Sequence, residues 1–431
     1  MSDVLLGKVK YLLPGGDALV HISSQGSHYK TCFVRQAIPG DLLSLSDAHK
    51  RRGVVRASLA KVEEASNKRV AASCSIAARC GGCALQYLHK DAHAAVKSQW
   101  VRDAFARVIT KNTQWLPVQT SGESHDEDWH RRRLRWHVGS NQQKQAILGF
   151  RAYQSHEVVE IDDCMVLTAE LEALRKALQL TLRNRVIKKP ESVYAVQLSD
   201  AIHVVLEYTG KCALDAMPPD IAWQGLKLQY WCRDKEGLRA LSKPVYQLYD
   251  YLPTATGDIA IHIGPDDFVQ GQKSGNRMMI EQILAWSAGA KYVVDLFSGA
   301  GNLSLPLAAS GMQVMGAEVN VASVRAANAN AKRLKLPATY QQSDLFGRFD
   351  SSPFVGADIL IVDPPRKGAK KICGLMNRLL PQKVILVHCD VLSGERDALE
   401  MKAQGYHLQA LRALDLFPYS GHVESMSLWT R

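Results

Sequence analysis

Three cysteines lie close together in the pattern Cys74-x5-Cys80-Gly-Gly-Cys83, which points to a metal centre. One glycine-containing loop can wrap these thiolates around a metal, and thiolates select zinc or iron–sulfur clusters. A four-ligand site needs one more thiolate, and Cys164 is the best candidate. The spacing is not that of a zinc ribbon, and three ligands plus one favour a [4Fe–4S] cluster. Ordinary packing is the alternative, and it is a stronger alternative for Cys164 than for the other three.

A second group of reactive side chains lies near the end of the chain. Cys389 follows the apolar residues 384–387, which predict a buried strand, so its thiol would stand at the carboxyl end of a sheet. A cysteine in that position can act as a nucleophile if the charge of a neighbouring His388 or a helix dipole lowers the pKa of its thiol. Glu424 lies in the loop FPYSGHVES, where its carboxylate could serve as a base or be a plain surface charge.

These side chains need a scaffold, and the segment KYVVDLFSGAGN from Lys291 to Asn302 predicts its centre. It reads as a short buried strand, a Gly-x-Gly turn and the start of an apolar helix over residues 303–309. Glu318 ends a second predicted strand 17 residues beyond Gly301, where a carboxylate can accept both hydroxyls of a ribose. The turn is not GxGxxG and no phosphate-binding lysine follows it, which favours S-adenosylmethionine over a dinucleotide or ATP. The alternative is any Rossmann-like βαβ unit.

Other polar side chains come directly after or before the same scaffold. Asp363 ends a predicted buried strand, residues 357–362, and two prolines fix it where the transferred methyl group and the target base would meet. Asp344 offers a contact for the adenine end of the cofactor, and Gln270 precedes the core where it could line the cofactor pocket. Taken alone, Asp363 could belong to a structural turn and Gln270 could be an exposed amide.

The composition is that of a globular protein with two or three domains in its 431 residues. No apolar run approaches the length of a membrane span and no signal peptide opens the chain, so we expect a cytoplasmic location. Nine cysteines in that compartment argue against a disulfide framework. We therefore expect Cys212, Cys232 and Cys373 to be separate buried thiols.

A formal net charge of +11 suits a polyanionic partner, although charge alone does not separate RNA from DNA or an acidic protein. Residues 129–137 carry four arginines between two tryptophans, a mixture that suits phosphate contacts and base stacking. If this segment is a strand, alternate arginines point to opposite faces, so not all four can meet RNA.

The remaining pattern predicts three domains. Residues 1–59 read as five short strands separated by glycine turns, which predicts a small OB-like barrel that binds single-stranded nucleic acid. This spacing also resembles the TRAM domain of RNA-modifying enzymes, and a generic β-module is the alternative. Residues 60–258 predict a β-rich central domain with the metal centre. Residues 259–431 predict an α/β class I, Rossmann-like methyltransferase domain.

Together, the motifs resemble those of the bacterial RNA uracil-5 methyltransferases, in particular the iron–sulfur, TRAM-bearing type that acts on 23S ribosomal RNA. The resemblance covers nearly the whole chain and rests on the order of C-x5-C-G-G-C, Phe268-x-Gln270, DLFSGAGN, GAE, DPPRKG and FPYSGHVES. It implies that a [4Fe–4S] cluster is held by Cys74, Cys80, Cys83 and Cys164. It implies that S-adenosylmethionine is bound by Gln270, Phe297, Asn302, Glu318, Asp344 and Asp363. It implies that Cys389 is the nucleophile and Glu424 the base.

In the implied reaction the Cys389 thiolate adds to carbon 6 of uracil, carbon 5 takes the methyl group, and Glu424 removes the carbon 5 proton. The target uridine has to leave its stack to reach such a site. Cytosine-5 enzymes with a similar core use a second cysteine just after the Asp-x-Pro motif, and the Asp363 motif has none, which favours uracil.

The chain departs from the family at the nucleophile, where the usual Ser-Cys-Asn-Pro is His388-Cys389-Asp390-Val391, and Gly271-Gln272 replaces the usual Val-Asn after Gln270. These changes leave the target nucleotide open. We expect a monomer that acts on 23S ribosomal RNA and binds neither membrane nor DNA. The alternatives are the same chemistry on transfer RNA, or a catalytically silent RNA-binding or ribosome-assembly factor.

Overall fold

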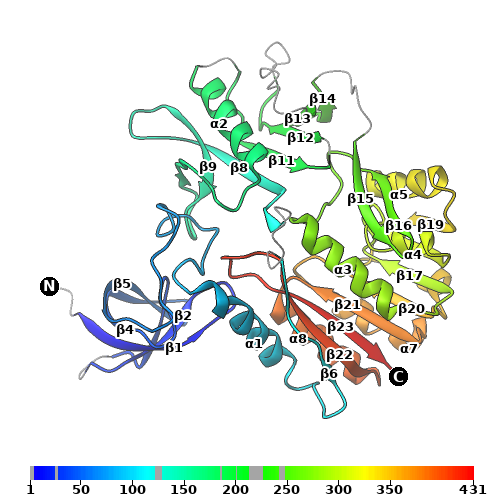
Figure 1. Cartoon of the computed structure of the whole chain (residues 1–431), viewed down its shortest axis with the longest axis horizontal. Helices are drawn as coiled ribbons and strands as arrows, with labels where there is room; N and C mark the ends of the chain where they lie inside the picture. Colours follow the sequence, from blue (N-terminus) through cyan, green and yellow to red (C-terminus); the bar gives the residue numbers. More distant parts are fainter. Residues whose placement is uncertain are drawn as a thin grey trace.

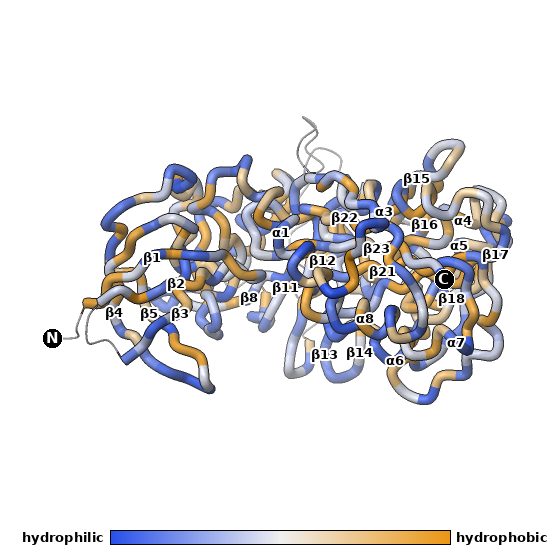
Figure 2. Tube along the Cα trace, turned by 90° about the horizontal axis from the view of Figure 1, so that it is seen from below, coloured by the Kyte–Doolittle hydropathy of each residue, from blue (hydrophilic) through white to orange (hydrophobic). Residues whose placement is uncertain are grey.

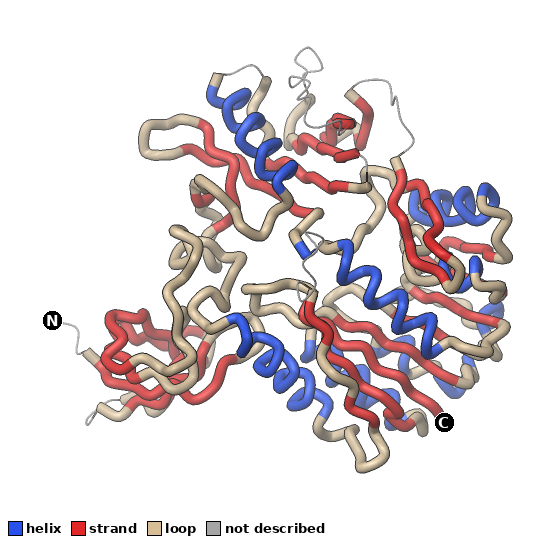
Figure 3. The backbone as a smooth tube through the Cα atoms, viewed as in Figure 1, coloured by secondary structure: helices blue, strands red, loops and turns tan. Residues whose placement is uncertain are grey.

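The structure is a computed structural model that describes residues 4–24, 28–121, 129–184, 187–199, 201–212, 227–241 and 248–431. Figure 1 shows three bodies: a small barrel that holds the start of the chain, a central sheet, and an α/β body that holds its end. In Figure 3 the strands of all three bodies gather into sheets, whereas most helices lie against the α/β body. Among the described residues, no helix is long and apolar enough to cross a membrane.

The first body is a closed barrel with the strand order β1-β2-β3-β5-β4. Its strands are β1 (Leu5–Leu12), β2 (Ala18–Ile22), β3 (Thr31–Val34), β4 (Leu42–Arg51) and β5 (Val54–Glu64). Val9, Val20 and Leu43 are buried inside it, because alternate side chains of a strand face the same side. The predicted OB-like barrel is confirmed. Its last strand continues past residue 59, and residues 1–3 of the predicted domain lie outside the described ranges.

The central sheet has the strand order β10-β9-β8-β11-β12-β13-β14. Its elements are β8 (Arg133–Ser140), β9 (Ala146–Arg151), β10 (Val158–Val159), α2 (Ala169–Arg183), β11 (Ser192–Gln197), β12 (Ala201–Glu207), β13 (Lys227–Asp234) and β14 (Gly237–Ala240). The side chain of Thr168 caps the start of α2 by accepting a hydrogen bond from Leu171 N. The apolar stripe of α2, including Leu171 and Leu178, then packs in one core with Trp136 and Val204 of the sheet.

One prediction about the central sheet is wrong: Cys212 and Cys232 are paired in a disulfide and are not separate thiols. Cys232 lies on β13, and Cys212 follows β12 after a short loop. Because β12 and β13 are parallel neighbours, the two cysteines come within 6.6 Å of each other at their Cα atoms. This neighbourhood depends on strand order, which the sequence separation of 20 residues does not reveal.

The α/β body contains a sheet with the order β19-β18-β17-β20-β21-β23-β22-β6, in which β6 (Gln114–Trp115) comes from earlier in the chain. Its C-terminal strands are β17 (Tyr292–Leu296), β18 (Gln313–Glu318), β19 (Ala338–Gln342), β20 (Ile359–Val362), β21 (Lys383–His388), β22 (His407–Asp415) and β23 (Glu424–Thr430). Its helices in this region are α3 (Lys273–Trp286), α4 (Leu305–Ala309), α5 (Val321–Arg333), η3 (Ser352–Phe354), α6 (Lys370–Cys373), α7 (Met376–Leu379) and α8 (Val391–Ala403). Neighbouring strands from β19 to β21 are parallel, and β23 is antiparallel to β21. This is the Rossmann-like class that the sequence predicts.

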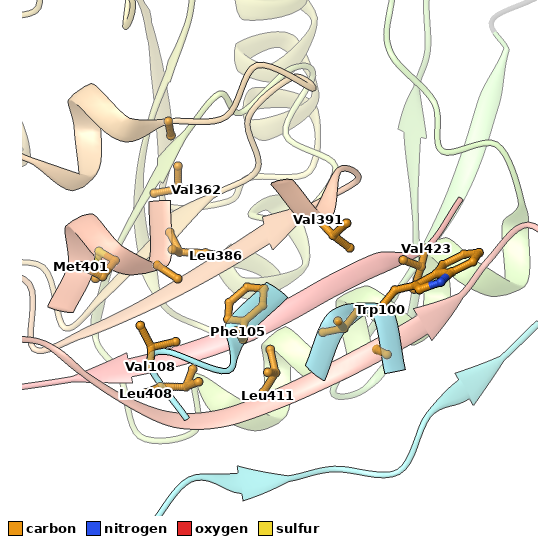
Figure 4. Close-up of a cluster of buried hydrophobic side chains, with 14 of the residues drawn as sticks. Trp100, Phe105, Val108, Val362, Leu386, Val391, Met401, Leu408, Leu411 and Val423 are labelled. Carbon is orange, nitrogen blue, oxygen red and sulfur yellow. The ribbon is translucent and has the colours of Figure 1, made fainter. Parts of the chain in front are cut away.

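Helices cover both faces of this sheet. On one face, α3, α4 and α5 pack with side chains such as Val293 and Ile361. On the other face, α1 (His93–Phe105), α6, α7 and α8 pack with Leu360 and Leu386, and Figure 4 shows Phe105 of α1 among these apolar side chains. Figure 2 shows the hydropathy along the chain, with hydrophobic stretches on β21 and β23. Strands that are buried on both faces therefore form near-continuous apolar runs.

The division of the chain among the sheets differs from the predicted boundaries. The elements η1 (Lys90–Ala92), α1 (His93–Phe105), β6 (Gln114–Trp115) and β7 (Gln119–Thr120) precede the central sheet in sequence. Nevertheless, β6 and β7 pair with β22 of the α/β body. Lys97 of α1 is fully buried and donates to Asp415 at the end of β22 at 2.5 Å. The hairpin of β15 (Tyr249–Thr254) and β16 (Gly257–His262) also spans the predicted boundary after residue 258.

Candidate active site

A cavity of about 1030 Å³ lies where the carboxyl ends of β17, β18, β20 and β21 meet the central sheet. In a parallel α/β sheet this edge is where ligands bind. The walls come from the α/β body, from the central sheet and from the cysteine-containing loop before α1. One continuous space therefore connects residues that are more than 300 positions apart in the chain, such as Cys80 and Cys389.

The six residues predicted to bind the cofactor all line this cavity: Gln270, Phe297, Asn302, Glu318, Asp344 and Asp363. The carboxylate of Glu318 accepts hydrogen bonds from Gly299 N at 3.1 Å and from Asn320 N at 2.8 Å. These bonds fix the carboxylate beside the glycine turn after β17. Phe297 has a φ of 68°, a left-handed conformation that is costly for an aromatic residue and is common at functional sites.

The cofactor end of the cavity has features that fit a polar ligand. Both carboxylate oxygens of Asp295 are buried without a well-formed hydrogen bond, although the Ser304 hydroxyl lies nearby. Burial, with the charges of Asp363 and Glu318 adding to it, raises the pKa of Asp295 to about 7. An orphaned buried carboxyl group beside an open space needs a partner, and a bound ligand can supply one.

An aromatic pair that the sequence analysis did not identify closes the same end of the cavity. The rings of Phe297 and Phe346 lie 5.2 Å apart, and the ammonium of Lys367 lies 3.3 Å from the centre of the Phe346 ring. Asp344 accepts hydrogen bonds from the backbone of Phe346 and Gly347, and these bonds lower the pKa of its carboxyl group. Phe346 follows the predicted Asp344, and its aromatic character two positions later is the signal that could have identified it.

Cys389 and Glu424 are brought together by strand pairing. Residue His388 at the end of β21 pairs with Ser425 at the start of β23, so the next residues on the two strands, Cys389 and Glu424, are adjacent as well. Both line the cavity together with Asp363. The nucleophile and the base predicted from separate motifs therefore share one location, which their separation of 35 residues did not guarantee.

The environment of this pair disfavours negative charge. Burial, followed by the charges of Glu424 and Asp363, raises the pKa of the Cys389 thiol to about 12. Burial and Asp363 likewise raise the pKa of Glu424 to about 8, and desolvation raises the pKa of Asp363 to about 7. The positive charge of Arg366 opposes the shifts of both Cys389 and Glu424. An added positive charge in this cavity would therefore favour the thiolate and the carboxylate.

Two arginines and a histidine complete this part of the cavity. Arg366 and Arg131 line it, and neither forms an ion pair with another described residue. His422 also faces the open cavity, where desolvation by its walls, followed by the charges of Arg366 and Arg131, lowers its pKa to about 4. Its imidazole is therefore neutral at neutral pH. Arg366 follows the predicted site residue Asp363 in the DPPR segment, so its place in the cavity could have been predicted from the sequence.

The arginine segment divides as the strand argument predicts. Arg132 is buried and forms two hydrogen bonds with Asp250, at 2.8 and 2.9 Å, so it serves the fold. Arg133 and Arg135 line the cavity, and the guanidinium of Arg133 lies 4.2 Å above the ring of Phe268, which is 49% exposed. This wall therefore presents planar and basic groups to the cavity.

The cysteines of the first motif lie at the far end of the same cavity, where Cys80, Cys83 and Cys164 line it. Burial and the mutual influence of neighbouring thiols, Cys74 included, raise the pKa values of Cys83 to about 11 and of Cys164 to about 12. Within the described ranges, no three potential ligands are close enough to hold a single metal ion. The four thiols thus gather in one region without forming a site for one ion.

Comparisons with known proteins show the family of this chain. The model of the family described as "Methyltransferase small domain" matches residues 270–384. The "23S rRNA (uracil(1939)-C(5))-methyltransferase RlmD" of Shewanella piezotolerans is 33% identical over 427 residues, covering 95% of this chain and 94% of that protein. The protein of the same name from Pseudomonas entomophila is 33% identical over 422 residues, covering 93% and 89%. The chain belongs to the 23S rRNA uracil-5 methyltransferase family. The resemblance inferred from the motifs is confirmed.

A solved structure supports the fold of this uracil-5 methyltransferase over its whole length. The Pyrococcus abyssi "tRNA (uracil-54, C5)-methyltransferase in complex with S-adenosyl-L-homocysteine" superposes with a TM-score of 0.72. The two chains are 19% identical, and the match covers 98% of this chain and 99% of the other. At that identity the similarity describes the fold alone.

Of the residues that depart from the usual pattern of the uracil-5 methyltransferases, Gly271 and Gln272 line the cavity, whereas His388, Asp390 and Val391 beside the nucleophile lie outside it. His388 is buried and its Nε2 lies 3.1 Å from an oxygen of Asp397 on α8. Asp390 caps α8 by accepting a hydrogen bond from Ser393 N at 2.8 Å, and Val391 belongs to the apolar core. The three changed residues beside Cys389 therefore serve packing and helix capping, and none of them faces the cavity.

Proposed function

We propose that this protein methylates carbon 5 of a uridine in 23S ribosomal RNA with S-adenosylmethionine as methyl donor. The observation that carries the proposal is the adjacency of Cys389 and Glu424 in a cavity that also holds the predicted cofactor residues. Relatives that are about one-third identical over almost the whole chain are 23S rRNA uracil-5 methyltransferases for position 1939, and we extend that target to this protein.

The residues of the cavity would act in sequence. Uracil carbon 5 is a weak nucleophile, so the Cys389 thiolate first adds to carbon 6 and the ring becomes an enolate. When bound, S-adenosylmethionine supplies an electrophilic methyl group for carbon 5. Glu424 then takes the proton from carbon 5, and the electron pair of that bond expels Cys389 as carbon 5 and carbon 6 regain their double bond. Arg366 would favour both the thiolate and the carboxylate through its positive charge.

The cavity fits the proposed methyl donor. Glu318 would accept the ribose hydroxyls, because its carboxylate is already oriented by two backbone amides. Phe297 and Phe346 provide flat surfaces for an adenine, and the unpartnered carboxyl group of Asp295 offers a further polar contact. Asp363, next to Cys389 and Glu424, would lie nearest the reacting centre.

We also propose that Cys74, Cys80, Cys83 and Cys164 hold a [4Fe–4S] cluster. Thiolates are the usual ligands of iron–sulfur clusters, and the electrostatic influence of Cys74 and Cys80 on Cys83, and of Cys80 and Cys83 on Cys164, places the four thiols in one region. The raised pKa values of Cys80, Cys83 and Cys164 mean that metal binding would displace protons from these thiols. No step of the proposed methylation passes through the cluster. Iron and sulfide analysis after anaerobic purification tests this, and Cys83→Ser should lose both elements while Cys373→Ser, a buried thiol of the α/β body, should keep them.

The experiment that tests the function is mass spectrometry of 23S ribosomal RNA from cells with and without the gene. Loss of one 5-methyluridine at the equivalent position on deletion supports the proposal. Loss of the modification from transfer RNA, with 23S RNA unchanged, would assign the same chemistry to the other RNA. No change in either RNA would favour a silent RNA-binding protein, and purified protein with unmodified RNA and labelled methyl donor would then decide the matter.

A further inference from the structure

The loop that leads into Glu424, the first residue of β23, is held by parts of the chain that are far away in sequence. This loop, residues 416–423, connects β22 to β23, and in Figure 1 it extends from the α/β body toward the barrel. Three of its backbone carbonyls accept hydrogen bonds from elsewhere: Phe417 O from Lys97 Nζ at 2.8 Å, Tyr419 O from Leu85 N at 2.7 Å, and Gly421 O from Gly15 N at 2.9 Å. The last of these donors belongs to the barrel.

The barrel contributes the turn between β1 and β2, residues 13–17, and this turn fits tightly against the loop. A Cβ atom at Gly421 would lie 2.4 Å from the carbonyl carbon of Gly15, so only glycine allows this approach. Gly16 is buried with a φ of 88°, and a Cβ atom there would lie 2.3 Å from the Cβ of Ala84, which follows Cys83. The turn is thus packed between the cysteine loop and the Glu424 loop.

The same turn is also fixed from its other side. Asp17 accepts hydrogen bonds from the hydroxyl of Tyr153, at 2.9 and 3.0 Å, and from the guanidinium of Arg56 at 2.8 Å. Tyr153 follows β9 of the central sheet and lines the cavity, and the guanidinium of Arg35 lies 3.7 Å above its ring. The turn therefore joins the barrel, the central sheet and the α/β body at one point.

We propose that the barrel turn formed by Gly15, Gly16 and Asp17 is a positioning element for Glu424, so that the barrel controls proton abstraction as well as RNA binding. This inference rests on the proposed function. A base that is displaced by about 1 Å can lose as much as 100-fold in rate. A barrel that shifts on the α/β body would move the loop before Glu424 through the Gly15–Gly421 contact, whereas Cys389, directly after β21, would stay in place.

The test compares two glycines of the same barrel. Gly16→Ala adds a methyl group that meets Ala84, whereas Gly53→Ala adds one at a similar φ, 82°, in the turn between β4 and β5, where nothing lies within 4 Å. With a 23S RNA fragment and labelled methyl donor, we expect Gly16→Ala to slow turnover about tenfold or more through misplacement of the base. The methylated covalent protein–RNA adduct should accumulate on denaturing gels, because addition of Cys389 proceeds and its release is slow. Gly53→Ala should behave as the unaltered protein, and RNA affinity should be unchanged in both.

A rescue variant separates the contact from backbone strain. In Gly16→Ala combined with Ala84→Gly, the nearest atoms to the new methyl group lie at 3.4 and 3.5 Å, so normal release should return. If Gly16→Ala fails to fold, Tyr153→Phe removes the hydrogen bonds to Asp17 without adding an atom, and it should show a smaller accumulation of the same adduct.

Other outcomes would overturn the inference. If Gly16→Ala bound RNA more weakly, with unchanged turnover and no accumulated adduct, the barrel would serve only to bind RNA. If Gly16→Ala and Gly53→Ala behaved alike, the close packing of Gly16 against Ala84 would have no part in positioning Glu424. If the unaltered protein makes no 5-methyluridine in any RNA, the proposed function itself fails, which this comparison distinguishes from a failure of the barrel turn alone.

Discussion

The two ends of the candidate active-site cavity are built in different ways. Five of the six predicted cofactor residues lie between residues 297 and 363, at or just after the ends of parallel strands in one sheet. The end where the target base would react combines Cys389 and Glu424, which follow the pairing of β21 with β23, with Arg131, which precedes the central sheet. The cofactor end is therefore built within one sheet, whereas the target end exists only after the central sheet has met the α/β body. This difference predicts which substitutions affect binding of the donor and which affect the reaction with RNA.

The largest effect should come from the target end. Cys389→Ala removes the proposed nucleophile and should reduce methyl transfer by at least about 1000-fold, because no other step can activate carbon 5. Binding of S-adenosylmethionine, measured by calorimetry, should stay within the range of the unaltered protein because Cys389 takes no part in holding it. Glu424→Gln is the matched variant, and it should trap a covalent RNA adduct that Cys389→Ala cannot form. Substantial activity of Cys389→Ala would remove the basis of the proposed chemistry.

The pH dependence of the reaction should reflect the same end. The pKa of Glu424 is raised to about 8, so below that pH the carboxyl group is protonated and cannot act as a base. The value of kcat/KM should therefore fall at least about tenfold for each pH unit below 8, and it should keep rising more slowly above pH 8 because the Cys389 thiol, with a pKa raised to about 12, is then still mostly protonated. Deprotonation of the Cys389 thiol also raises the rate as the pH increases. A profile that is flat from about pH 6 to pH 8 would contradict a base in the environment described for Glu424.

A smaller and different effect should come from the cofactor end. Glu318→Ala removes the charged acceptor proposed for the ribose hydroxyls, and hydrogen bonds to charged groups contribute about 1.5–3 kcal/mol each. We expect the affinity for S-adenosylmethionine to fall about 10- to 100-fold, with little change in the rate at saturating donor. Glu318→Gln, which keeps one acceptor oxygen, should lose less. If Glu318→Ala lowered the saturated rate and left the affinity unchanged, the division between the two ends of the cavity would be incorrect.

The smallest effect on activity is expected at His388, directly before the nucleophile. Because its ring points to Asp397 and not into the cavity, replacing it by the serine usual in the family should change kcat by less than about threefold. The cost should appear in stability, since the buried Asp397 loses a partner, and we expect about 1–3 kcal/mol in denaturant unfolding. Asn377→Ser, an exposed position on α7, is a suitable control. A large loss of activity in His388→Ser would assign this residue to the reaction.

The sequence allowed the cofactor end to be predicted in detail because each strand end there has its own motif. Glu318 and Asp363 follow apolar runs that are buried on both faces, and their places at one sheet edge follow from parallel topology. The target end was predicted only as separate pieces. That Cys389 and Glu424 are adjacent depends on the antiparallel pairing of β21 with β23, and no spacing in the chain expresses this pairing.

Two differences between the predicted and the observed structure also arise from pairing between strands. The segment with α1, β6 and β7 reads as part of a middle domain because it lies there in sequence, yet its apolar face completes the sheet of the α/β body. The disulfide between Cys212 and Cys232 was missed because it depends on two parallel strands being neighbours. In both cases the contact joins residues whose neighbours in the sequence carry no motif that predicts it.

The buried pair of Lys97 and Asp415 links the order of synthesis to the order of folding. Lys97 is synthesised more than 300 residues before Asp415, its partner carboxylate. The strand β6 is likewise synthesised long before β22, with which it pairs. Such distant contacts form late and slowly in folding. The barrel can close while the chain is still growing, but α1 cannot dock until the last strands exist. Protease resistance of α1 in ribosome-bound chains of increasing length would reveal this, with protection expected only after β22 has left the exit tunnel. Catalytic competence is thus acquired in one late step, after the chain is complete.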